Sequence, residues 1–293
     1  MRSNALDERV EIHPAGAPAP LAGTYLPARG TALGNVVLLG GTATPARFYR
    51  PFAEHLAGRG LGTLTVDWSG QAASGDPREH PTVTMSDWLV RDAPAVVAWA
   101  AAHLDGPLLG LGHSLGGHAL ALGAGGTDIA AFATVASHAG VTSAIPTWDE
   151  RLRVGLVLGV AGPVLSRLCG YMPGARLGLG EDMPRDAMLE WSRWTRQPDY
   201  FFSDPALGAA DRMARVRAKV LAVGVSDDLW ATEQQIGRIT ERLTAAEVER
   251  HTVTPADVGA TAIGHHGYFR QKVAASAWPL VSDWLAARAG ELA

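Results

Sequence analysis

The 293-residue sequence has a single cysteine, Cys169. A lone cysteine cannot form a disulfide within its own chain, and it cannot supply a metal site built from several thiolates. The sequence therefore excludes the small disulfide-stabilised folds and the zinc-finger class of domain. Because scarce cysteine suits a reducing compartment, we expect a cytoplasmic location.

Long apolar runs and runs of one charge are also missing. Glycine, proline or a charged residue interrupts the apolar stretches well before the roughly 18 residues that a membrane span needs, so we expect no membrane partner. The segment Met1–Arg9 lacks the apolar core of a secretory signal. The net charge is −4 and no basic run stands out, so we expect no nucleic-acid partner.

Apolar residues, by contrast, are plentiful. They make up 47% of the chain and charged residues 18%, a balance that excludes wholesale disorder and supplies a large core. Strands are expected at residues 9–13, 21–26, 35–39, 64–66, 108–111, 132–136 and 220–223. Helical periodicity follows several of them, at residues 48–56, 86–104, 119–122, 234–243 and 268–287. This alternation predicts an α/β fold with a mostly parallel central sheet and helices on both faces.

The alternation stops between residues 141 and 206. No strand pattern is visible there, an apolar helical stretch covers residues 154–168, and aromatic residues gather. We therefore expect a helical cap at 141–206, inserted between core segments 1–140 and 207–293. Trp191 and Trp194 lie three residues apart in this cap, as on one helix face. Core packing is the commoner role for such a pair, and the alternative is a wall that binds an apolar substrate.

The segment Gly112–Gly117 (Gly-His-Ser-Leu-Gly-Gly) carries the strongest chemical signal. It fits the pattern G-x-S-x-G, which places a nucleophilic serine on a tight turn between a strand and a helix. Glycines two residues before and after that serine let the strand and the helix approach without clashes. Ser114 is therefore the candidate nucleophile, and the Leu115 N–H at the helix start is a candidate donor to an oxyanion.

A serine nucleophile needs a base and an acid that orients the base. Asp227 and Asp228 follow the strand at 220–223, and His265 and His266 lie in a loop before the last helix. Each pair comes at the end of the sheet where Ser114 is expected. Taken alone, these residues leave the choice within each pair open. Adjacent histidines rarely chelate one ion, so we expect no metal.

Two further segments are expected to border the same site. The loop after the strand at 35–39 should supply a second oxyanion donor, with the Thr42 N–H first and the Gly41 N–H second. His138 follows the strand at 132–136, where it either lines the pocket or has a purely structural role. Gly41, His138, Trp191 and Trp194 are therefore the candidate substrate-binding residues.

The chain resembles the α/β-hydrolase superfamily over nearly its whole length, and most closely a group of uncharacterised bacterial predicted α/β-hydrolases. The resembling stretches are 47–54, 112–117, 177–180, 226–231 and 263–270. The resemblance implies a Ser–His–acid triad without a cofactor, with Ser114 as nucleophile, Asp228 as acid and His265 as base. Thr232 stands where many such enzymes carry proline after the acid, and Asp227 keeps the usual spacing from Gly224.

These observations predict a serine hydrolase that cleaves an ester, thioester or lactone of a mainly apolar small molecule through an acyl-enzyme on Ser114. The alternatives are an acyltransferase or cyclase of secondary metabolism that uses the same triad, and a binding protein that has kept the fold. The sequence leaves the substrate and the oligomeric state open, with a homo-oligomer allowed.

Overall fold

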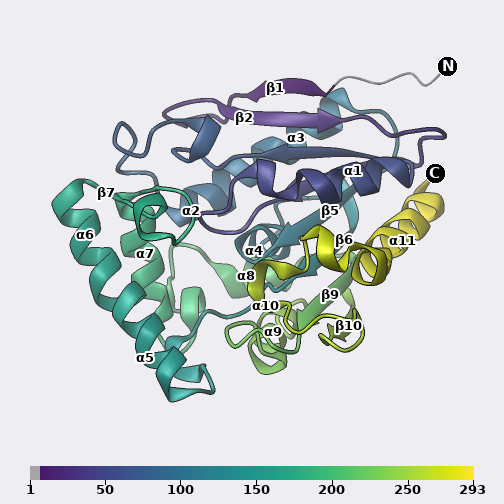
Figure 1. The fold of residues 1–293 in the computed structure, drawn as a ribbon. Coiled ribbons are helices and arrows are strands. Elements are labelled where there is room, and N and C mark those ends of the chain that lie inside the picture. The colour runs from purple at the N-terminus through teal and green to yellow at the C-terminus, as the bar shows by residue number, and fades with distance from the viewer. Residues whose placement is uncertain (1–6) are drawn as a thin grey trace.

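The computed structural model describes residues 7–293, which fold around one eight-stranded sheet (Figure 1). The spatial order of the strands is β1-β2-β4-β3-β5-β6-β9-β10. β1 and β4 each pair with β2 in antiparallel fashion, and all pairs from β4 to β10 are parallel. The bounds are β1 Glu8–Ile12, β2 Leu21–Leu26, β3 Gly34–Leu39, β4 Leu61–Val66, β5 Leu108–His113, β6 Ile129–Val135, β9 Lys219–Val225 and β10 Glu247–Val253. The predicted mostly parallel α/β fold is thus confirmed.

Strand β3 lies in the interior of the sheet and is buried on both faces. Val36 and Leu38 belong to a core cluster shared with helices α1 (Arg50–Gly58) and α11 (Ala274–Leu292). Val37 and Leu39 belong to a second cluster, shared with α3 (Ala93–His103) and α4 (Leu115–Ala121). Because successive side chains of a strand point to opposite faces, a continuous apolar run is what such a position requires.

The structure differs from the sequence prediction at two elements of the C-terminal part. β10 was not expected, because its residues are mainly polar and most of them are exposed. As an edge strand it pairs with β9 alone and needs no continuous apolar run. The last helix begins at Ala274 rather than near Tyr268, after the short helix α10 (Gly264–Gly267). The remaining helices of the core are α2 (Met85–Asp87) and α9 (Glu233–Thr240).

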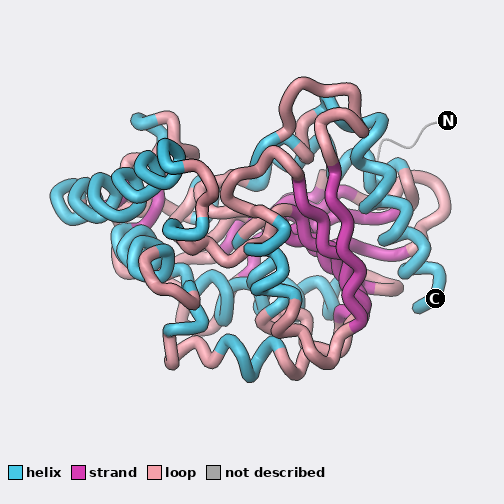
Figure 2. The backbone as a smooth tube through the Cα atoms, turned by 90° about the horizontal axis from the view of Figure 1, so that it is seen from below, coloured by secondary structure: helices cyan, strands magenta, loops and turns pink. Residues whose placement is uncertain are grey.

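The segment between β6 and β9 contributes no strand to the sheet. It contains the helices α5 (Trp148–Leu156), α6 (Gly162–Cys169), α7 (Arg185–Thr195) and α8 (Ala209–Met213), and a small ribbon of β7 (Tyr171–Met172) and β8 (Met183–Pro184). A π-helical turn, Val157–Ala161, joins α5 to α6 into one long helix. This long helix stands at the side of the molecule in Figures 1 and 2. We refer to residues 141–206 as the cap.

Candidate active site

Ser114 lies on the tight turn between β5 and α4. Its backbone has φ 50° and ψ −111°, in the left-handed range of φ that a serine seldom adopts. The turn is compact because glycines border it. A Cβ on Gly112 would lie 2.2 Å from the Gly117 N, and one on Gly116 would lie 2.0 Å from the Leu39 O. The glycines are therefore a steric requirement for holding Ser114 in this strained conformation.

The structure brings Asp228, and not Asp227, to His265. The His265 Nδ1–H donates to the Asp228 Oδ2 over 2.6 Å, and the Asp228 Oδ1 accepts from the backbone N–H groups of Trp230 and Ala231. Burial on its own would raise the pKa of the Asp228 carboxyl, but the charge and hydrogen bond of His265 outweigh it and hold that pKa below its usual range. Asp228 is thus an anion that fixes the ring of His265 and leaves its Nε2 free to accept a proton.

Asp227 has a different task. Its two carboxylate oxygens accept the backbone N–H groups of Ile263 and Gly264, at 2.8 and 3.0 Å. The carboxylate therefore ties the loop after β9 to the start of α10, the short helix that carries His265. The adjacent aspartates thus have different partners: Asp228 contacts the His265 imidazole, and Asp227 contacts the backbone just before His265.

The two candidate oxyanion donors face the same space. Within residues 7–293 the N–H groups of Thr42 and Leu115 donate to no acceptor, and both residues line the cavity beside Ser114. The Gly41 N–H, by contrast, donates to the Tyr49 Oη over 2.8 Å. This leaves the Thr42 N–H, rather than that of Gly41, available to an oxyanion.

A buried chain of hydrogen bonds joins this loop to the His265 backbone. The His113 Nε2–H donates to the His265 carbonyl oxygen over 2.9 Å, so the Nδ1 of that ring is an acceptor. The Tyr49 O–H donates to this Nδ1 over 2.7 Å while its oxygen accepts the Gly41 N–H. Burial raises the pKa of the Tyr49 phenol and lowers that of His113, so both stay neutral. Sequence reasoning missed Tyr49; its one signal was a hydroxyl within the apolar helix after Gly41.

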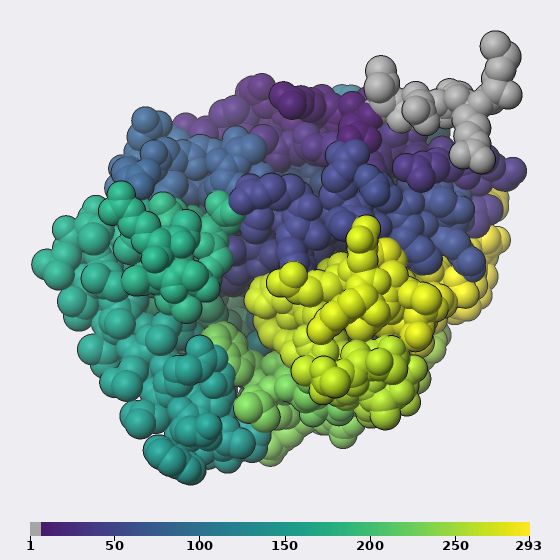
Figure 3. Space-filling view, in the orientation of Figure 1, coloured from purple at the N-terminus to yellow at the C-terminus, as the bar shows by residue number. Residues whose placement is uncertain are grey.

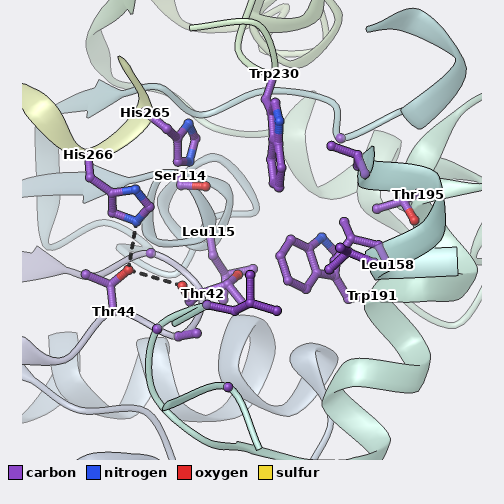
Figure 4. A pocket seen from close by; sticks show the side chains of 18 of the residues that line it. Thr42, Thr44, Ser114, Leu115, Leu158, Trp191, Thr195, Trp230, His265 and His266 are labelled. Atoms are coloured by element: carbon purple, nitrogen blue, oxygen red, sulfur yellow. Dashed lines mark hydrogen bonds between the residues drawn. The ribbon is translucent and has the colours of Figure 1, made fainter. Parts of the chain in front are cut away.

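A second chain supports Thr42 from the other side. The Thr44 Oγ1–H donates to the Thr42 carbonyl oxygen over 3.1 Å, and the His266 Nε2–H donates to the Thr44 Oγ1 over 3.2 Å (Figure 4). Burial lowers the pKa of His266 to about 4, which keeps it neutral at pH 7. His266 therefore supports the loop that carries Thr42, and its Nε2 is already engaged, unlike that of His265.

The cavity next to Ser114 has a volume of about 680 Å³. It extends from the loops at the carboxyl ends of the parallel strands, which we call the sheet edge, to the cap. Its cap side is mainly apolar, with Val154, Leu158, Met188 and Trp191 among the lining residues. Figure 4 shows His265 and Thr42 near Ser114, and Trp191 and Leu158 on the opposite side. The cap also contributes the charged side chains Glu150, Arg153 and Glu181, but its lining is mainly apolar, as in a site that holds an apolar molecule around one reactive group.

His138 and Trp191 line this cavity, whereas Trp194 does not. The structure corrects the prediction for Trp194, because its ring is 1% exposed and its Nε1–H donates to the Asp204 Oδ2 over 3.1 Å. His138 lies beside His265, with ring centroids 5.4 Å apart. Burial, followed by the charge of His265, lowers the pKa of His138 to about 4. Among residues 7–293, no group of three or more His, Cys, Asp or Glu side chains could hold a metal ion.

The family follows from a comparison with family models. The model described as serine aminopeptidase, S33, matches residues 30–237, which is more than half of the chain. The chain belongs to this family. It is an α/β-hydrolase, and the S33 match runs from just before β3 to α9, so it includes the Ser114 turn, the cap and Asp228.

Solved structures share the fold of this S33 hydrolase over nearly its whole length. A soluble variant of monoglyceride lipase from Saccharomyces cerevisiae is 15% identical, with a TM-score of 0.67, over 99% of this chain and 97% of that one. A monoacylglycerol lipase from Paleococcus ferrophilus is 16% identical, with a TM-score of 0.60, over 91% and 98%. A Pyrococcus furiosus esterase is 15% identical, with a TM-score of 0.57, over 98% and 89%. No curated protein matches the sequence.

Proposed function

We propose that the protein is a serine hydrolase that cleaves an ester, thioester or lactone of a mainly apolar small molecule. The observation that carries the proposal is the position of Ser114, on a strained turn at the polar end of the cavity, next to a His265 ring held by Asp228. His265 takes the Ser114 proton as the hydroxyl attacks the acyl carbon, and Asp228 stabilises the imidazolium that forms. The N–H groups of Thr42 and Leu115 receive the developing oxyanion.

The second half of the reaction uses the same groups. The imidazolium of His265 gives its proton to the leaving alkoxide or thiolate as its bond to the acyl carbon breaks, which leaves an ester on Ser114. The alcohol or thiol then departs or, for a lactone, stays attached to the acyl group as its hydroxyl. His265 then takes a proton from water, whose oxygen attacks that ester, and the acid is released as Ser114 recovers its proton. Acyl transfer would replace the water with an alcohol or an amine.

The family name includes aminopeptidases, and the carboxylates at the cavity favour an ester over a peptide. An acidic side chain that is available to the ammonium group would favour recognition of a free peptide N-terminus. Each of the four acidic side chains that line the cavity already has partners. They are Glu150 with Arg153 and Trp230, Glu181 with Arg47, Asp227 with two backbone N–H groups, and Asp228 with His265.

A panel of p-nitrophenyl esters and thioesters of increasing acyl length tests the proposal, with aminoacyl anilides as the competing substrates. We expect turnover of the esters to rise with chain length while the acyl group fills the apolar side of the cavity, and Ser114→Ala to abolish it. Turnover of the anilides alone would contradict the ester assignment. Repeating the assay with an added alcohol or amine, and identifying the products, separates hydrolysis from acyl transfer.

A further inference from the structure

The outward face of the long cap helix carries a stripe of large apolar side chains. Its six members are 48% to 78% exposed and recur at every fourth position: Trp148, Leu152, Leu156, Val160, Val164 and Leu168. Side chains four residues apart are neighbours on a helix surface, so the six form one continuous row along it. We call these six residues the cap stripe.

The helix that carries the cap stripe is apolar on its inward face as well. Val154 and Leu158 point inward, are buried and line the cavity. By length and composition the helix Trp148–Cys169 could cross a membrane, yet 28% of its most apolar window is buried against the rest of the chain. Since the inward face already contacts the protein, only the outward face is free for a partner. This geometry fits a helix that lies on a lipid surface rather than one that spans a bilayer.

The charges around the cap stripe fit an anionic surface. Residues 147–180 contain two acidic residues, Asp149 and Glu150, and four arginines, which gives +2 for this segment against −4 for the whole chain. No charge falls between Arg153 and Arg167. Arg151, Arg167 and Arg176 form no ion pair with any residue from 7 to 293. The stripe is thus uncharged along its middle. At its Trp148 end Arg151 is balanced by Asp149, which is likewise unpaired within residues 7–293, and at its Leu168 end Arg167 and Arg176 leave a net positive charge, which suits anionic lipids.

Two further leucines of the cap are exposed, and one of them also lines the cavity. Leu177 and Leu179 follow the helix and are 48% and 41% exposed, and Leu179 also lines the cavity beside Ser114. Figure 3 shows the cap, in teal, as a lobe at one side of the molecule. A surface that contacts this lobe would therefore lie near an opening lined by apolar side chains.

We propose that the cap stripe docks the protein onto an anionic lipid surface, with the helix Trp148–Cys169 parallel to that surface. A second copy of the chain is the competing occupant, and the test below distinguishes it. Anionic headgroups would neutralise Arg167 and Arg176. We therefore revise the expectation of no membrane partner. That expectation depended on glycine and proline interrupting the apolar runs in the sequence, and they do not interrupt this helix. The docking itself is independent of the proposed function. The further step, that the lipid surface supplies an apolar substrate to the cavity, rests on the proposed function.

Flotation with lipid vesicles tests the docking. Wild-type protein should float with vesicles of phosphatidylcholine mixed with phosphatidylglycerol, less with pure phosphatidylcholine, and less again at high salt. The triple variant Leu156→Ser, Val160→Ser, Val164→Ser should lose about tenfold or more in partitioning, because three apolar side chains no longer enter the lipid. Leu292→Ser, which changes another exposed leucine outside the cap, is the matched control and should float like wild type.

Two results would overturn the docking proposal. One is a triple variant that stays folded by circular dichroism and floats like wild type. The other is a wild-type protein that floats with neither vesicle. If that protein sediments as a dimer and the triple variant as a monomer, the stripe joins two copies instead. Ser114→Ala should float like wild type, and because flotation needs no turnover, a failure of the proposed chemistry is distinguishable from a failure of docking.

Discussion

The loops at the sheet edge and the cap form opposite sides of one cavity, and they are held in different ways. At the sheet edge, polar side chains bind backbone groups at short distances, as Asp227 does with Ile263 and Gly264 and as Tyr49 does with Gly41. In the cap, the lining is mainly apolar, and the outward face of its long helix is apolar too. The sheet edge fixes the positions of the reacting atoms, and the cap provides the apolar wall of the cavity and an exposed apolar face.

This difference separates two kinds of specificity. Directional hydrogen bonds tolerate little displacement, so changes at the sheet edge should act mainly on kcat. Apolar contacts are non-directional and scale with area, so changes in the cap should act mainly on KM and on which acyl chain is preferred. Four substitution experiments test this difference between the two sides.

The largest effect is expected at the acid. Asp228→Asn should lower kcat by about a thousandfold or more, because the amide cannot stabilise the imidazolium and can hold the wrong tautomer of His265. Asp227→Asn is the matched control. It keeps an oxygen for one of the two N–H groups, so kcat should fall by only about tenfold, with a loss of about 1–2 kcal/mol in the free energy of unfolding. Steady-state kinetics measures kcat, and urea denaturation measures the free energy of unfolding. Equal losses of kcat in the two variants would contradict the different roles of the two aspartates.

The next effect concerns the buried tyrosine. Tyr49→Phe should lower kcat by about tenfold to a hundredfold with little change in KM, because the Gly41 N–H loses its partner and the neighbouring Thr42 N–H is no longer held in place. Tyr268→Phe is the control, since the Tyr268 hydroxyl is buried and donates to the Ala277 carbonyl oxygen away from the cavity. It should cost stability and leave kcat unchanged. If the two variants lose kcat equally, Tyr49 has no positioning role.

Acid should weaken the sheet-edge side, because burial lowers the pKa of several of its histidines, while residues 141–206 contain no histidine. Burial lowers the pKa of His118 to about 3 and that of His138 to about 4. Below about pH 6.5 the unfolded chain binds protons that the folded chain does not, so stability is complete above that pH and falls as the pH decreases. The slope is about 1.4 kcal/mol per pH unit for each histidine. His118 lies on α4. Urea denaturation between pH 7 and 5 should show that His118→Gln lowers the slope of the unfolding free energy against pH by about the contribution of one histidine. An unchanged slope would show that His118 does not cause the loss of stability in acid.

The smallest effect is expected inside the cap. Trp191→Ala should raise KM severalfold for long acyl chains and leave short ones nearly unchanged, because it removes apolar wall from the cavity. Trp194→Phe should leave KM unchanged and lower the melting temperature, because Trp194 is buried and its N–H bonds Asp204. A severalfold KM change in Trp194→Phe would show that the buried ring, and not only Trp191, shapes the pocket.

The same contrast explains how far the sequence could predict the site. The Ser114 turn was predictable because its glycines are a local steric need, visible as Gly112 and Gly116. The choice between Asp227 and Asp228 could not be made from the residues alone, because it depends on how one turn orients two adjacent side chains. Trp191 and Trp194 are likewise three residues apart on α7, and only packing against the rest of the chain decides which one meets the cavity.

The missed features follow the same logic. β10 escaped prediction because an edge strand needs no apolar period. Tyr49 escaped because its partners, Gly41 and His113, are distant in sequence from one another. The cap stripe was overlooked because glycine and Pro163 interrupt the apolar run in sequence without ending the helix. A tight turn can thus be predicted from the residues that form it, whereas contacts between segments distant in sequence cannot.

Covalent labelling shows whether Ser114 is the attacking residue. The folded protein is treated with a fluorophosphonate, digested and analysed by mass spectrometry. Our account predicts one phosphonyl adduct on the peptide that contains Ser114, its loss in Ser114→Ala, and much slower labelling in Asp228→Asn than in Asp227→Asn. An unlabelled Ser114 in folded protein, or an adduct on another residue, would contradict it.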